Sequence, residues 1–496
     1  MEEVCNKHGI TEKVQLDTDV TECRWLEDEE LWEVTIKRLL PGMGDLGQKD
    51  RAKMLQTYGE SRVYSCTEKI RTKVVLSCAG GLVEPKGWPE DIPGTKDFKG
   101  AMFHSSRWDH AVDFNDKDVV IVGTGCSAAQ IVPHLITSPF NAKSVTQLMR
   151  SPPWVIDSLT PPGGAEWWKK NSPYLMTYVP GLLKLTRLSM AARSEYDFRL
   201  FCHGQWHEQE RKKVEGALLR RMKRIVPEKY HEILTPDYGV GCKRRILDSW
   251  FPALSDPKIE LTTLPLTSVQ EHSVTLGPGR LYPDPNKPSN VSVEQKTVPA
   301  DIIVLANGFD VQNWLHPLKV TGKHGKDLID TMMERGGPQA YQGTAMDGFP
   351  NFFIIFGPNT ATGHSSVITA SENMADYAMR FVKPLLKGDV STVEVKMEAE
   401  QAYTRDIQQS LSKTVWMSGG CQSWYYTKDG WNSTVLPYVY IQSPPSYIVA
   451  DLGCLDTRRY GSGTDACFPA GGIGTSRILA RAKSSLLWLV FSNFAC

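Results

Sequence analysis

The sequence predicts an α/β fold of the Rossmann type, with parallel sheets, and one short region carries most of this prediction. The apolar run Val119–Val122 is typical of a buried strand, and a glycine-spaced string follows it directly. Ala128–Val132 has the pattern of a helix start, and Ser144–Met149 supplies the next strand. Residues 117–155 are therefore expected to form a βαβ unit, the arrangement that places a dinucleotide pyrophosphate at a helix N-terminus.

The glycine-spaced string gives each of its positions a physical role. Gly123 permits a tight turn from strand to helix, Gly125 lets a pyrophosphate approach the backbone, and Ala128 lets the helix pack closely on the sheet. We expect the cofactor-binding turn to comprise Gly123, Thr124, Gly125, Cys126, Ser127, Ala128, Ala129 and Gln130.

The residues after the second strand indicate which dinucleotide binds. Sites for NAD usually place an acidic residue there, to bind the ribose 2′-hydroxyl. Here Arg150 and Ser151 follow the strand, and an arginine pairs well with a 2′-phosphate. NADP is therefore favoured over NAD. The alternative is a purely structural turn beside a solvated arginine.

Length and composition describe a globular protein of several domains. At 496 residues the chain exceeds one ordinary core, so two or three domains are expected. The 56 basic and 56 acidic residues balance, which argues against a nucleic acid or an anionic membrane as a partner. No ligand spacing for a metal is visible, so no metal site is expected.

The cysteines and both termini indicate a cytoplasmic protein. The 11 cysteines show no paired spacing, which suits reduced thiols. The N-terminus lacks a secretory signal, and the apolar stretch Leu486–Phe491 is too short to span a membrane.

Further along the chain, the patterns alternate between strands and helices. Residues 10–80 are predicted to form a strand-rich meander, 160–235 a helical insert, and 258–310 a return to strands. Phe352–Gly357 predicts a strand and Ser366–Val382 a helix, whereas residues after about 445 show no periodic pattern.

Three strings carry chemistry that core packing does not explain. Phe98–Trp108 reads F-K-G-A-M-F-H-S-S-R-W, and Asp109 follows it. Gly241–Asp248 holds three adjacent cations, which are either a solvated patch or a preorganised charge for anion stabilisation. Gly357–Ser366 is a Gly-Pro turn before a Ser-capped helix. No Ser/His/Asp or Cys/His nucleophile pattern appears.

Together these strings resemble the Baeyer–Villiger class of flavin monooxygenases, whose hallmark is F-x-G-x-x-x-H-x-x-x-W followed by Pro or Asp. The resemblance covers residues 5–440 and implies two dinucleotide-binding domains, FAD and NADP as cofactors, and oxygen insertion beside a ketone with molecular oxygen. It is nearest to fungal enzymes of polyketide mycotoxin pathways. It implies Arg244 as the catalytic arginine, Lys243 as a ligand of NADP, and His104 and Trp108 in the connection between the domains. Asn307, within Leu305–Asp310, and Asn359 are implied as cofactor contacts.

The chain departs from this family at its start. The family begins with an FAD fingerprint about 100 residues upstream of the point where this chain begins, and no such unit is present. The literal G-x-G-x-x-G at Gly42 is disfavoured because a half-buried, alternating strand precedes it. Truncation, weak FAD binding and a missed gene start all stay open. An incomplete FAD domain predicts an open sheet edge and exposed apolar surface.

These patterns divide the chain into four parts. Residues 1–110 form a partial FAD-binding domain, 111–260 an NADP-binding domain with its insert, 261–445 the return through both domains, and 446–496 an atypical tail. Two other functions stay open: a heteroatom-hydroxylating flavin monooxygenase, and a non-catalytic NADP-binding remnant. The ending Trp108-Asp109 favours the Baeyer–Villiger class over the first.

Overall fold

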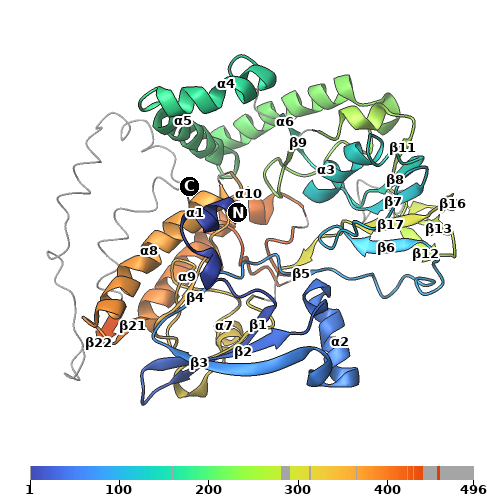
Figure 1. Cartoon of the computed structure of the whole chain (residues 1–496). Coiled ribbons are helices and arrows are strands. Elements are labelled where there is room, and N and C mark those ends of the chain that lie inside the picture. Colours follow the sequence, from blue (N-terminus) through green and yellow to red (C-terminus); the bar gives the residue numbers. More distant parts are fainter. Residues whose placement is uncertain are drawn as a thin grey trace.

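The computed structural model describes residues 2–157, 161–247, 249–280, 291–311, 314–364, 366–421, 423–427, 429–438 and 455–458. Figure 1 shows three regions: a sheet with strands β6 to β17, an antiparallel meander of β1 to β3, and helices α4 to α6. The apolar stretch 486–491 and Asp248 lie outside the described residues.

A five-stranded parallel sheet forms the first region. Its strand order is β11 (Ile259–Thr262), β8 (Ser144–Leu148), β7 (Asp118–Val122), β17 (Ile302–Leu305) and β6 (Ala101–His104). Every neighbouring pair is parallel. Helix α3 (Cys126–Leu135) connects β7 to β8, so the predicted βαβ unit is confirmed.

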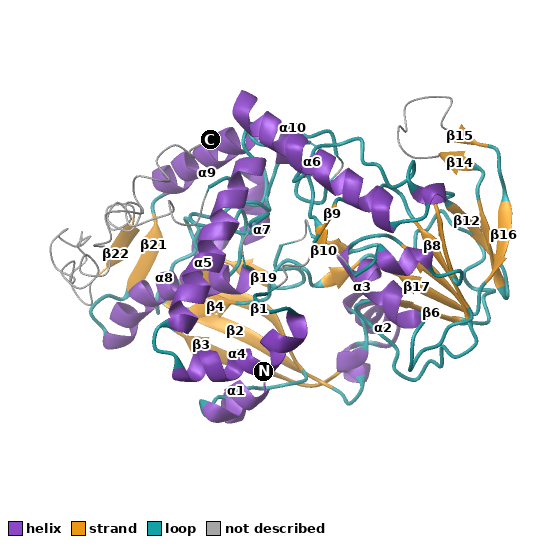
Figure 2. Ribbon diagram, turned by 90° about the horizontal axis from the view of Figure 1, so that it is seen from above, coloured by secondary structure: helices purple, strands orange, loops and turns teal. Residues whose placement is uncertain are grey.

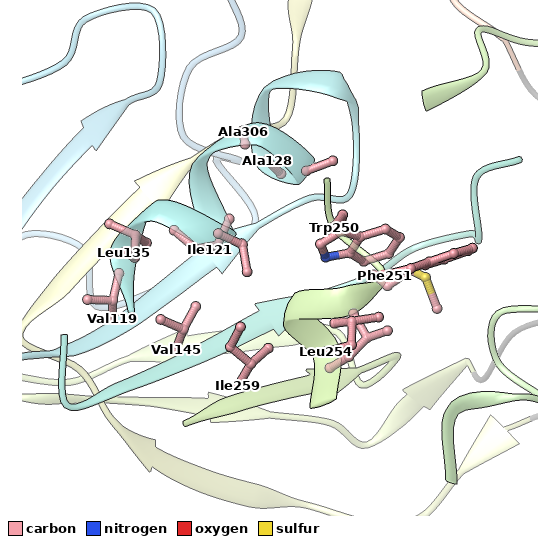
Figure 3. Packing of buried hydrophobic residues seen from close by; sticks show 14 of the residues in the cluster. Val119, Ile121, Ala128, Leu135, Val145, Trp250, Phe251, Leu254, Ile259 and Ala306 are labelled. Atoms are coloured by element: carbon pink, nitrogen blue, oxygen red, sulfur yellow. The ribbon is translucent and has the colours of Figure 1, made fainter. Parts of the chain in front are cut away.

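Apolar side chains cover both faces of this sheet, which explains the unbroken apolar run of β7. Figure 3 shows one face, where Val119, Ile121 and Val145 pack beneath α3 and Trp250. On the other face, Val120 and Ile303 pack against a three-stranded antiparallel sheet. That sheet consists of β12 (Leu266–Val269), β13 (Ser273–Leu276) and β16 (Lys296–Pro299).

The predicted meander is confirmed. Strands β1 (Thr18–Leu26), β2 (Leu31–Leu39) and β3 (Tyr64–Thr72) are antiparallel, and β19 (Lys319–Thr321) adds to β1 in parallel. The alternation of β2 places Trp32 in the core against Phe352. Helix α2 (Gln48–Tyr58) lies beside the meander and buries no residue.

A small parallel pair, β4 (Val75–Ser77) with β20 (Phe352–Ile354), lies above the meander. Helices α7 (Leu328–Glu334), α8 (Val367–Lys387) and α9 (Met397–Ser412) and strand β21 (Thr392–Val395) belong to the same region. Among the described residues, β4 pairs through one edge only. Its other edge lines a cavity of about 680 Å³, together with α2 and residues 315–318. The predicted open sheet edge is therefore confirmed, and Leu76 on it is exposed.

The helical insert is also confirmed. It consists of α4 (Ala165–Tyr178), α5 (Leu182–Asp197) and α6 (Gln205–Ile225). In Figure 2, α5 lies near α8, whereas α6 runs towards the parallel sheet. Most side chains of α4 and α5 are exposed, and α6 buries Arg211 and Met222.

Short elements complete the described fold. The short helices and strands are α1 (Glu2–Lys7), α10 (Val415–Ser418), β5 (Glu84–Pro85), β9 (Val155–Ile156), β10 (Ile246–Leu247), β14 (Gly279–Arg280), β15 (Val291–Ser292), β18 (Phe309–Asp310) and β22 (Leu455–Arg458). The 3₁₀ turns are η1 (Thr11–Lys13), η2 (Met43–Asp45), η3 (Glu60–Arg62), η4 (Phe198–Leu200), η5 (Glu228–Tyr230), η6 (Pro252–Ser255) and η8 (Lys323–Gly325).

One prediction from the sequence is wrong. The cysteines were expected to be reduced, but Cys242 and Cys421 form a disulfide with a Cα–Cα distance of 6.1 Å. The two residues are 179 positions apart in the chain, so no local spacing signals the pair. Only the fold brings them together.

Candidate functional site

The turn between β7 and α3 has the geometry that the glycine string predicts. Gly123 has a φ of +124°, and a Cβ atom there would lie 2.5 Å from the carbonyl oxygen of Ala306, so any larger residue would clash. Gly125 faces open space and precedes the first residue of α3, Cys126. The exposed backbone at Gly125 and the N-terminus of α3 therefore form an anion-binding position.

The other predicted residues of the turn divide by burial. Thr124, Ala128 and Ala129 are buried, and the two alanines pack against the sheet. Ser127 and Gln130 are exposed. This division agrees with close helix packing on one side and an open binding face on the other.

A buried hydrogen-bond relay supports the turn, and sequence reasoning missed it. The side chain of Gln147 is fully buried, and its Nε2 donates to the carbonyl oxygen of Gly123 at 3.0 Å. The indole Nε1 of Trp250 donates to Gln147 Oε1 at 2.8 Å. The available signal was the polar Gln147 within an otherwise apolar strand, because a buried amide needs partners.

Cations gather where β8 ends, beside the turn. Lys243 Nζ donates to Ser151 Oγ at 2.7 Å and lies 4.5 Å from the centre of the Tyr238 ring. Burial and, to a smaller extent, the nearby positive charge of Arg150 together lower the pKa of Lys243 to about 8. Arg150 itself is exposed. The structure thus brings together three predicted residues, Arg150, Ser151 and Lys243, into a site suited to a dianionic phosphate.

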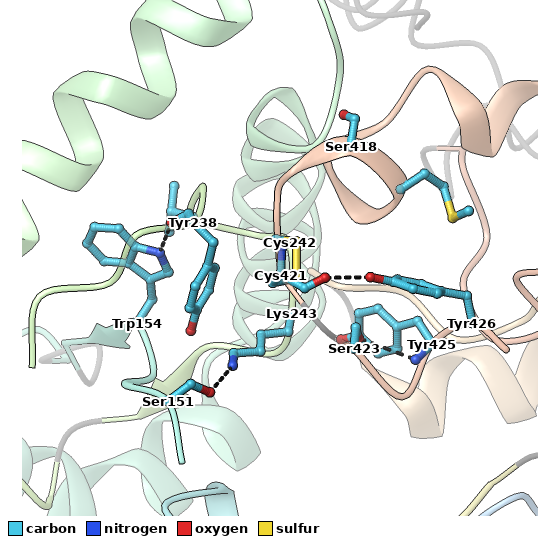
Figure 4. Close-up of a disulfide and its surroundings, with 12 residues drawn as sticks. Ser151, Trp154, Tyr238, Cys242, Lys243, Ser418, Cys421, Ser423, Tyr425 and Tyr426 are labelled. Atoms are coloured by element: carbon cyan, nitrogen blue, oxygen red, sulfur yellow. Dashed lines mark hydrogen bonds between the residues drawn. A yellow bond between two sulfur atoms is a disulfide. The ribbon is translucent and has the colours of Figure 1, made fainter. Parts of the chain in front are cut away.

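The disulfide joins this cation site to a segment from the far end of the chain. Figure 4 shows Cys242 bonded to Cys421, with Lys243 pointing towards Ser151 on one side and Tyr426 reaching Cys421 on the other. On the Ser151 side, Trp154 Nε1 donates to the carbonyl oxygen of Tyr238 at 2.9 Å. We call Gly419–Tyr426, of which Gln422 lies outside the described residues, the 419–426 segment.

Neighbouring arginines in the cation string have different surroundings. Arg244 is exposed, whereas burial lowers the pKa of Arg245, whose guanidinium lies 5.7 Å from the Phe201 ring centre. Tyr425 is buried, which raises its pKa to about 12 although Arg244 and Arg245 act in the opposite direction. Arg244 therefore presents the accessible charge next to the 419–426 segment.

His104 is the last residue of β6, and Trp108 lies in the connection from β6 to β7 of the parallel sheet. The buried His104 ring contacts the carbonyl oxygen of Gly308 through Nε2 at 3.1 Å. Trp108 stacks on Phe114 with ring centres 5.3 Å apart. Asn307 Nδ2 donates to the carbonyl oxygen of Gly87 at 3.2 Å. The contacts of His104 and Asn307 tie the segments at Gly87 and His104 to residues 307–308, whereas Trp108 packs against the core of the parallel sheet.

Asn359 uses its side chain inside the protein. Its Nδ2 donates to the carbonyl oxygens of Asn432 at 2.7 Å and Val435 at 3.2 Å, and the residue is buried. These bonds fix the turn Gly357–Thr360 on residues 432–435. Both amide protons of Asn359 therefore already have protein acceptors. The predicted contact of Asn359 with a cofactor stays a prediction.

No group of three or more His, Cys, Asp or Glu side chains in the described ranges is arranged to hold a metal ion. No helix that the structure describes is long and apolar enough to cross a membrane.

Comparison with known proteins agrees with this geometry. The model of the flavin-binding monooxygenase-like family matches residues 60–166. A FAD-binding monooxygenase, ktnD, of Aspergillus niger is 29% identical over 88% of this chain and 66% of its own length. A Baeyer–Villiger monooxygenase of Streptomyces coelicolor is also 29% identical, over 88% of this chain and 73% of its own length. This chain therefore spans about two thirds of the length of the first of these relatives.

Solved structures share the fold. A steroid monooxygenase bound to NADP has a TM-score of 0.68 at 20% identity, over 92% of this chain and 83% of its own. Cyclohexanone monooxygenase from Rhodococcus sp. Phi1 has a TM-score of 0.66 at 19% identity, with the same coverage.

The fold and the site define a class: α/β proteins with a dinucleotide-binding parallel sheet and a helical insert, which here lies between β9 and β10. Within it, this chain is similar to the flavin-binding monooxygenase-like family over residues 60–166 and to a Baeyer–Villiger monooxygenase at 29% identity.

Proposed function

We propose that this protein is a Baeyer–Villiger monooxygenase that uses NADPH and FAD to insert one oxygen atom beside a ketone, giving an ester or lactone. The observation that carries the proposal is a convergence in one parallel sheet. Three features lie at the carboxyl ends of its strands: His104 of the hallmark string at the end of β6, the glycine turn after β7, and the cation site after β8. Ligands of open α/β sheets bind at this edge.

The described residues fit NADP. The N-terminus of α3 and the open backbone at Gly125 would hold the pyrophosphate. Arg150 and Lys243 would hold the 2′-phosphate, with Ser151 orienting the lysine. These residues would also place the nicotinamide ring, the source of reducing electrons, within the region between the sheets.

The described residues fit FAD less completely. The string at Gly42 follows β2, an antiparallel strand, and leads into η2, where a Cβ on Gly44 would lie 2.8 Å from Asp17 Oδ1. It therefore lacks the parallel strand and open turn of a pyrophosphate site, as the sequence predicts. Among the described residues, no second parallel strand–turn–helix unit accompanies the one at β7 and α3. Bound flavin would supply the activation of oxygen.

Arg244 is the residue of this chain that would act on the ketone. When oxygen adds to the carbonyl carbon, negative charge develops on the carbonyl oxygen. An exposed guanidinium that keeps its proton stabilises that charge without neutralising it. His104, Trp108 and Asn307 would set how the two sheets move relative to each other, and Asn359 would fix the turn that faces the cofactor region.

We extend the proposal to the division of the chain and to its substrate. Residues 1–110, 111–260, 261–445 and 446–496 would be the four parts. The substrate would be a polyketide ketone of fungal secondary metabolism, a choice supported by the resemblance to such enzymes and by relatives from two Aspergillus species. The reaction would take place in the cytoplasm.

The test compares the amount of ester formed with the amount of NADPH consumed. The purified protein, supplied with FAD, is incubated with NADPH, oxygen and a panel of cyclic and polyketide ketones, and ester and consumed NADPH are measured. Ester formation in proportion to NADPH supports the proposal. Oxidation of an amine or sulfide, with no reaction of any ketone, would instead indicate a heteroatom-hydroxylating enzyme.

One observation favours a second candidate, an NADP-binding protein without oxygenase activity. It is the lack, among the described residues, of a second strand–turn–helix for FAD. The visible spectrum of the purified protein separates the two functions, because retained flavin absorbs there and NADP does not. A colourless protein that binds NADP but takes up no added FAD would be the second candidate.

A further inference from the structure

Cys242 and Cys421 link two parts of the molecule that meet at the cation site. Cys242 directly precedes Lys243 and Arg244, and Cys421 lies in the 419–426 segment, which also carries Tyr425. The disulfide therefore constrains the backbone one residue from the lysine that contacts Ser151. In Figure 4 the bond lies between Lys243 and the two tyrosines of the segment.

Contacts other than the disulfide also hold these parts together. Gly239 N donates to the carbonyl oxygen of Gly419 at 3.1 Å. A Cβ on Gly419 would lie 2.8 Å from the Cβ of Cys242, so the two backbones are in close contact. Cys242 and Cys421 belong to one buried cluster with Val240, Trp416 and Tyr425. These contacts predict that the fold persists without the disulfide, while the backbone at residues 242–244 becomes more mobile.

Residues 242–244 are expected to move when the disulfide is reduced. Burial destabilises the charged form of Lys243 and lowers its pKa to about 8, and Arg150 adds like-charge repulsion. Without a bound phosphate, the charged form of Lys243 is therefore more stable when the side chain moves towards water. The crosslink opposes this movement because it fixes the residue before Lys243 to the 419–426 segment.

We propose that the Cys242–Cys421 bond is a redox-controlled positioning crosslink, which keeps Lys243 beside Ser151 and Arg150 for binding a 2′-phosphorylated nicotinamide dinucleotide. The proposal rests on the proposed NADP site and is independent of the oxygenation step. Reduction of the bond lowers the affinity for NADP⁺ and leaves the affinity for NAD⁺ nearly unchanged, because NAD⁺ lacks the phosphate that Lys243 binds.

The reductant is a dithiol, and the exchange is balanced. One thiolate of the dithiol attacks Cys421 Sγ, since Cys421 is 8% exposed and Cys242 only 1%. The S–S bond breaks and Cys242 leaves as a thiolate. The second thiol of the dithiol then displaces Cys421 and closes a cyclic disulfide. Two electrons pass to the protein, two cysteine thiols form, and the dithiol is oxidised.

The experiment measures NADP⁺ and NAD⁺ affinity by calorimetry, on the full chain before and after treatment with dithiothreitol. Reduction is expected to weaken NADP⁺ binding about tenfold and NAD⁺ binding less than twofold, as loss of one charge-assisted contact requires. Cys421→Ser should bind NADP⁺ like the reduced protein, and the dithiol should not weaken it further. Cys66→Ser, which removes an exposed free cysteine, should behave like the unaltered chain.

Two results would overturn the proposal. One is reduced protein that binds NADP⁺ as tightly as oxidised protein. The other is an equal loss for NADP⁺ and NAD⁺, which would indicate general loosening of the turn. If Cys421→Ser does not fold, the dithiol titration of the unaltered chain still decides. No ketone or oxygen enters these measurements, so their failure is distinct from a failure to oxygenate.

Discussion

His104 and Gly308, 204 residues apart in sequence, meet where the neighbouring strands β6 and β17 end, with 3.1 Å between Nε2 and the carbonyl oxygen. A carbonyl oxygen only accepts, so Nε2 carries the proton. The backbone N–H of Ser106 donates to Nδ1 at 3.1 Å, so the ring is neutral. Burial lowers the pKa of His104, against the opposing effects of Gly308 and Asn307. The pairing of β5 with β18 also joins the segment before β6 to the segment after β17, and we call this region of contacts the junction.

This contact predicts a defect in turnover when the ring is removed. His104→Ala should slow ketone oxygenation about tenfold or more and weaken NADP⁺ binding less, because the residue acts on the junction and not on the cofactor. Steady-state kinetics and calorimetry on the same preparation measure both. His110→Ala, an exposed histidine nearby, is the control. Normal turnover in a folded His104→Ala protein would contradict the assignment.

Arg150 should decide between the two nicotinamide coenzymes. Arg150→Ala removes a charge-assisted contact of about 1.5–3 kcal/mol with the 2′-phosphate. NADPH binding should weaken about tenfold or more, and NADH binding should hardly change. Binding titrations with both coenzymes check this, with Arg107→Ala, another exposed arginine, as the control. Equal losses for NADPH and NADH would show that Arg150 supports the turn generally.

Lys243 should make NADP⁺ binding depend on pH. Its pKa of about 8 means that the ammonium is present below pH 8 and is lost as the pH rises through that value. Since the charged form binds phosphate, NADP⁺ affinity should fall between about pH 7 and pH 9. NAD⁺ affinity should stay level, and Lys243→Met should flatten the NADP⁺ profile. A steep profile that survives in Lys243→Met would assign the titration to another group.

Gln147 should support the binding of both coenzymes and the stability of the fold. Gln147→Leu leaves Trp250 Nε1 and the carbonyl oxygen of Gly123 without this partner. The free energy of unfolding should fall by about 1–3 kcal/mol, and NADP⁺ and NAD⁺ should weaken together because the turn serves both. Chemical denaturation and calorimetry provide the two measurements. Gln130→Leu, an exposed residue on α3, should change the stability little.

Local patterns explain which parts of the fold the sequence predicts. The apolar run at β7 is buried on both faces, and the alternation in β2 places Trp32 inward, so burial on each strand leaves a periodic signal. The turn at Gly123 is local too, because its left-handed φ favours glycine. The extent of β4 was less predictable: an apolar run from Lys73 to Gly80 contains a strand of three residues, since β20 pairs with only those.

The missed parts depend on contacts between distant residues. Cys242 meets Cys421, and Gln147 meets Trp250, across 179 and 103 positions. No spacing rule links such pairs, because the chain between them folds as other elements. The sequence makes Arg150 a candidate for the 2′-phosphate, and the resemblance implies Lys243 as a ligand of NADP. That these residues lie close together depends on β10 lying parallel to β9. Their roles in binding and catalysis stay predictions until the variants are measured.

Arg244 provides the most direct test of the proposed reaction. NADPH consumption needs no stabilised charge on the ketone oxygen, whereas oxygen insertion does. In a preparation loaded with FAD, Arg244→Ala should therefore keep consuming NADPH, lose at least about 100-fold in ester formation, and release hydrogen peroxide instead. Arg244→Lys should recover little of the ester, because a flexible point charge does not reproduce the planar guanidinium.

Arg245 is the matched comparison, because it is adjacent in sequence but burial lowers its pKa and its guanidinium lies over Phe201. Arg245→Lys should lower stability more than it alters the ratio of ester to NADPH, since its charge serves the packing of the insert. Product yield, peroxide yield and thermal unfolding, measured together, separate these effects. If Arg244→Ala still couples NADPH oxidation to ester formation while the Arg245 variant uncouples it, the catalytic role belongs to Arg245, and Arg244 is a solvated surface cation.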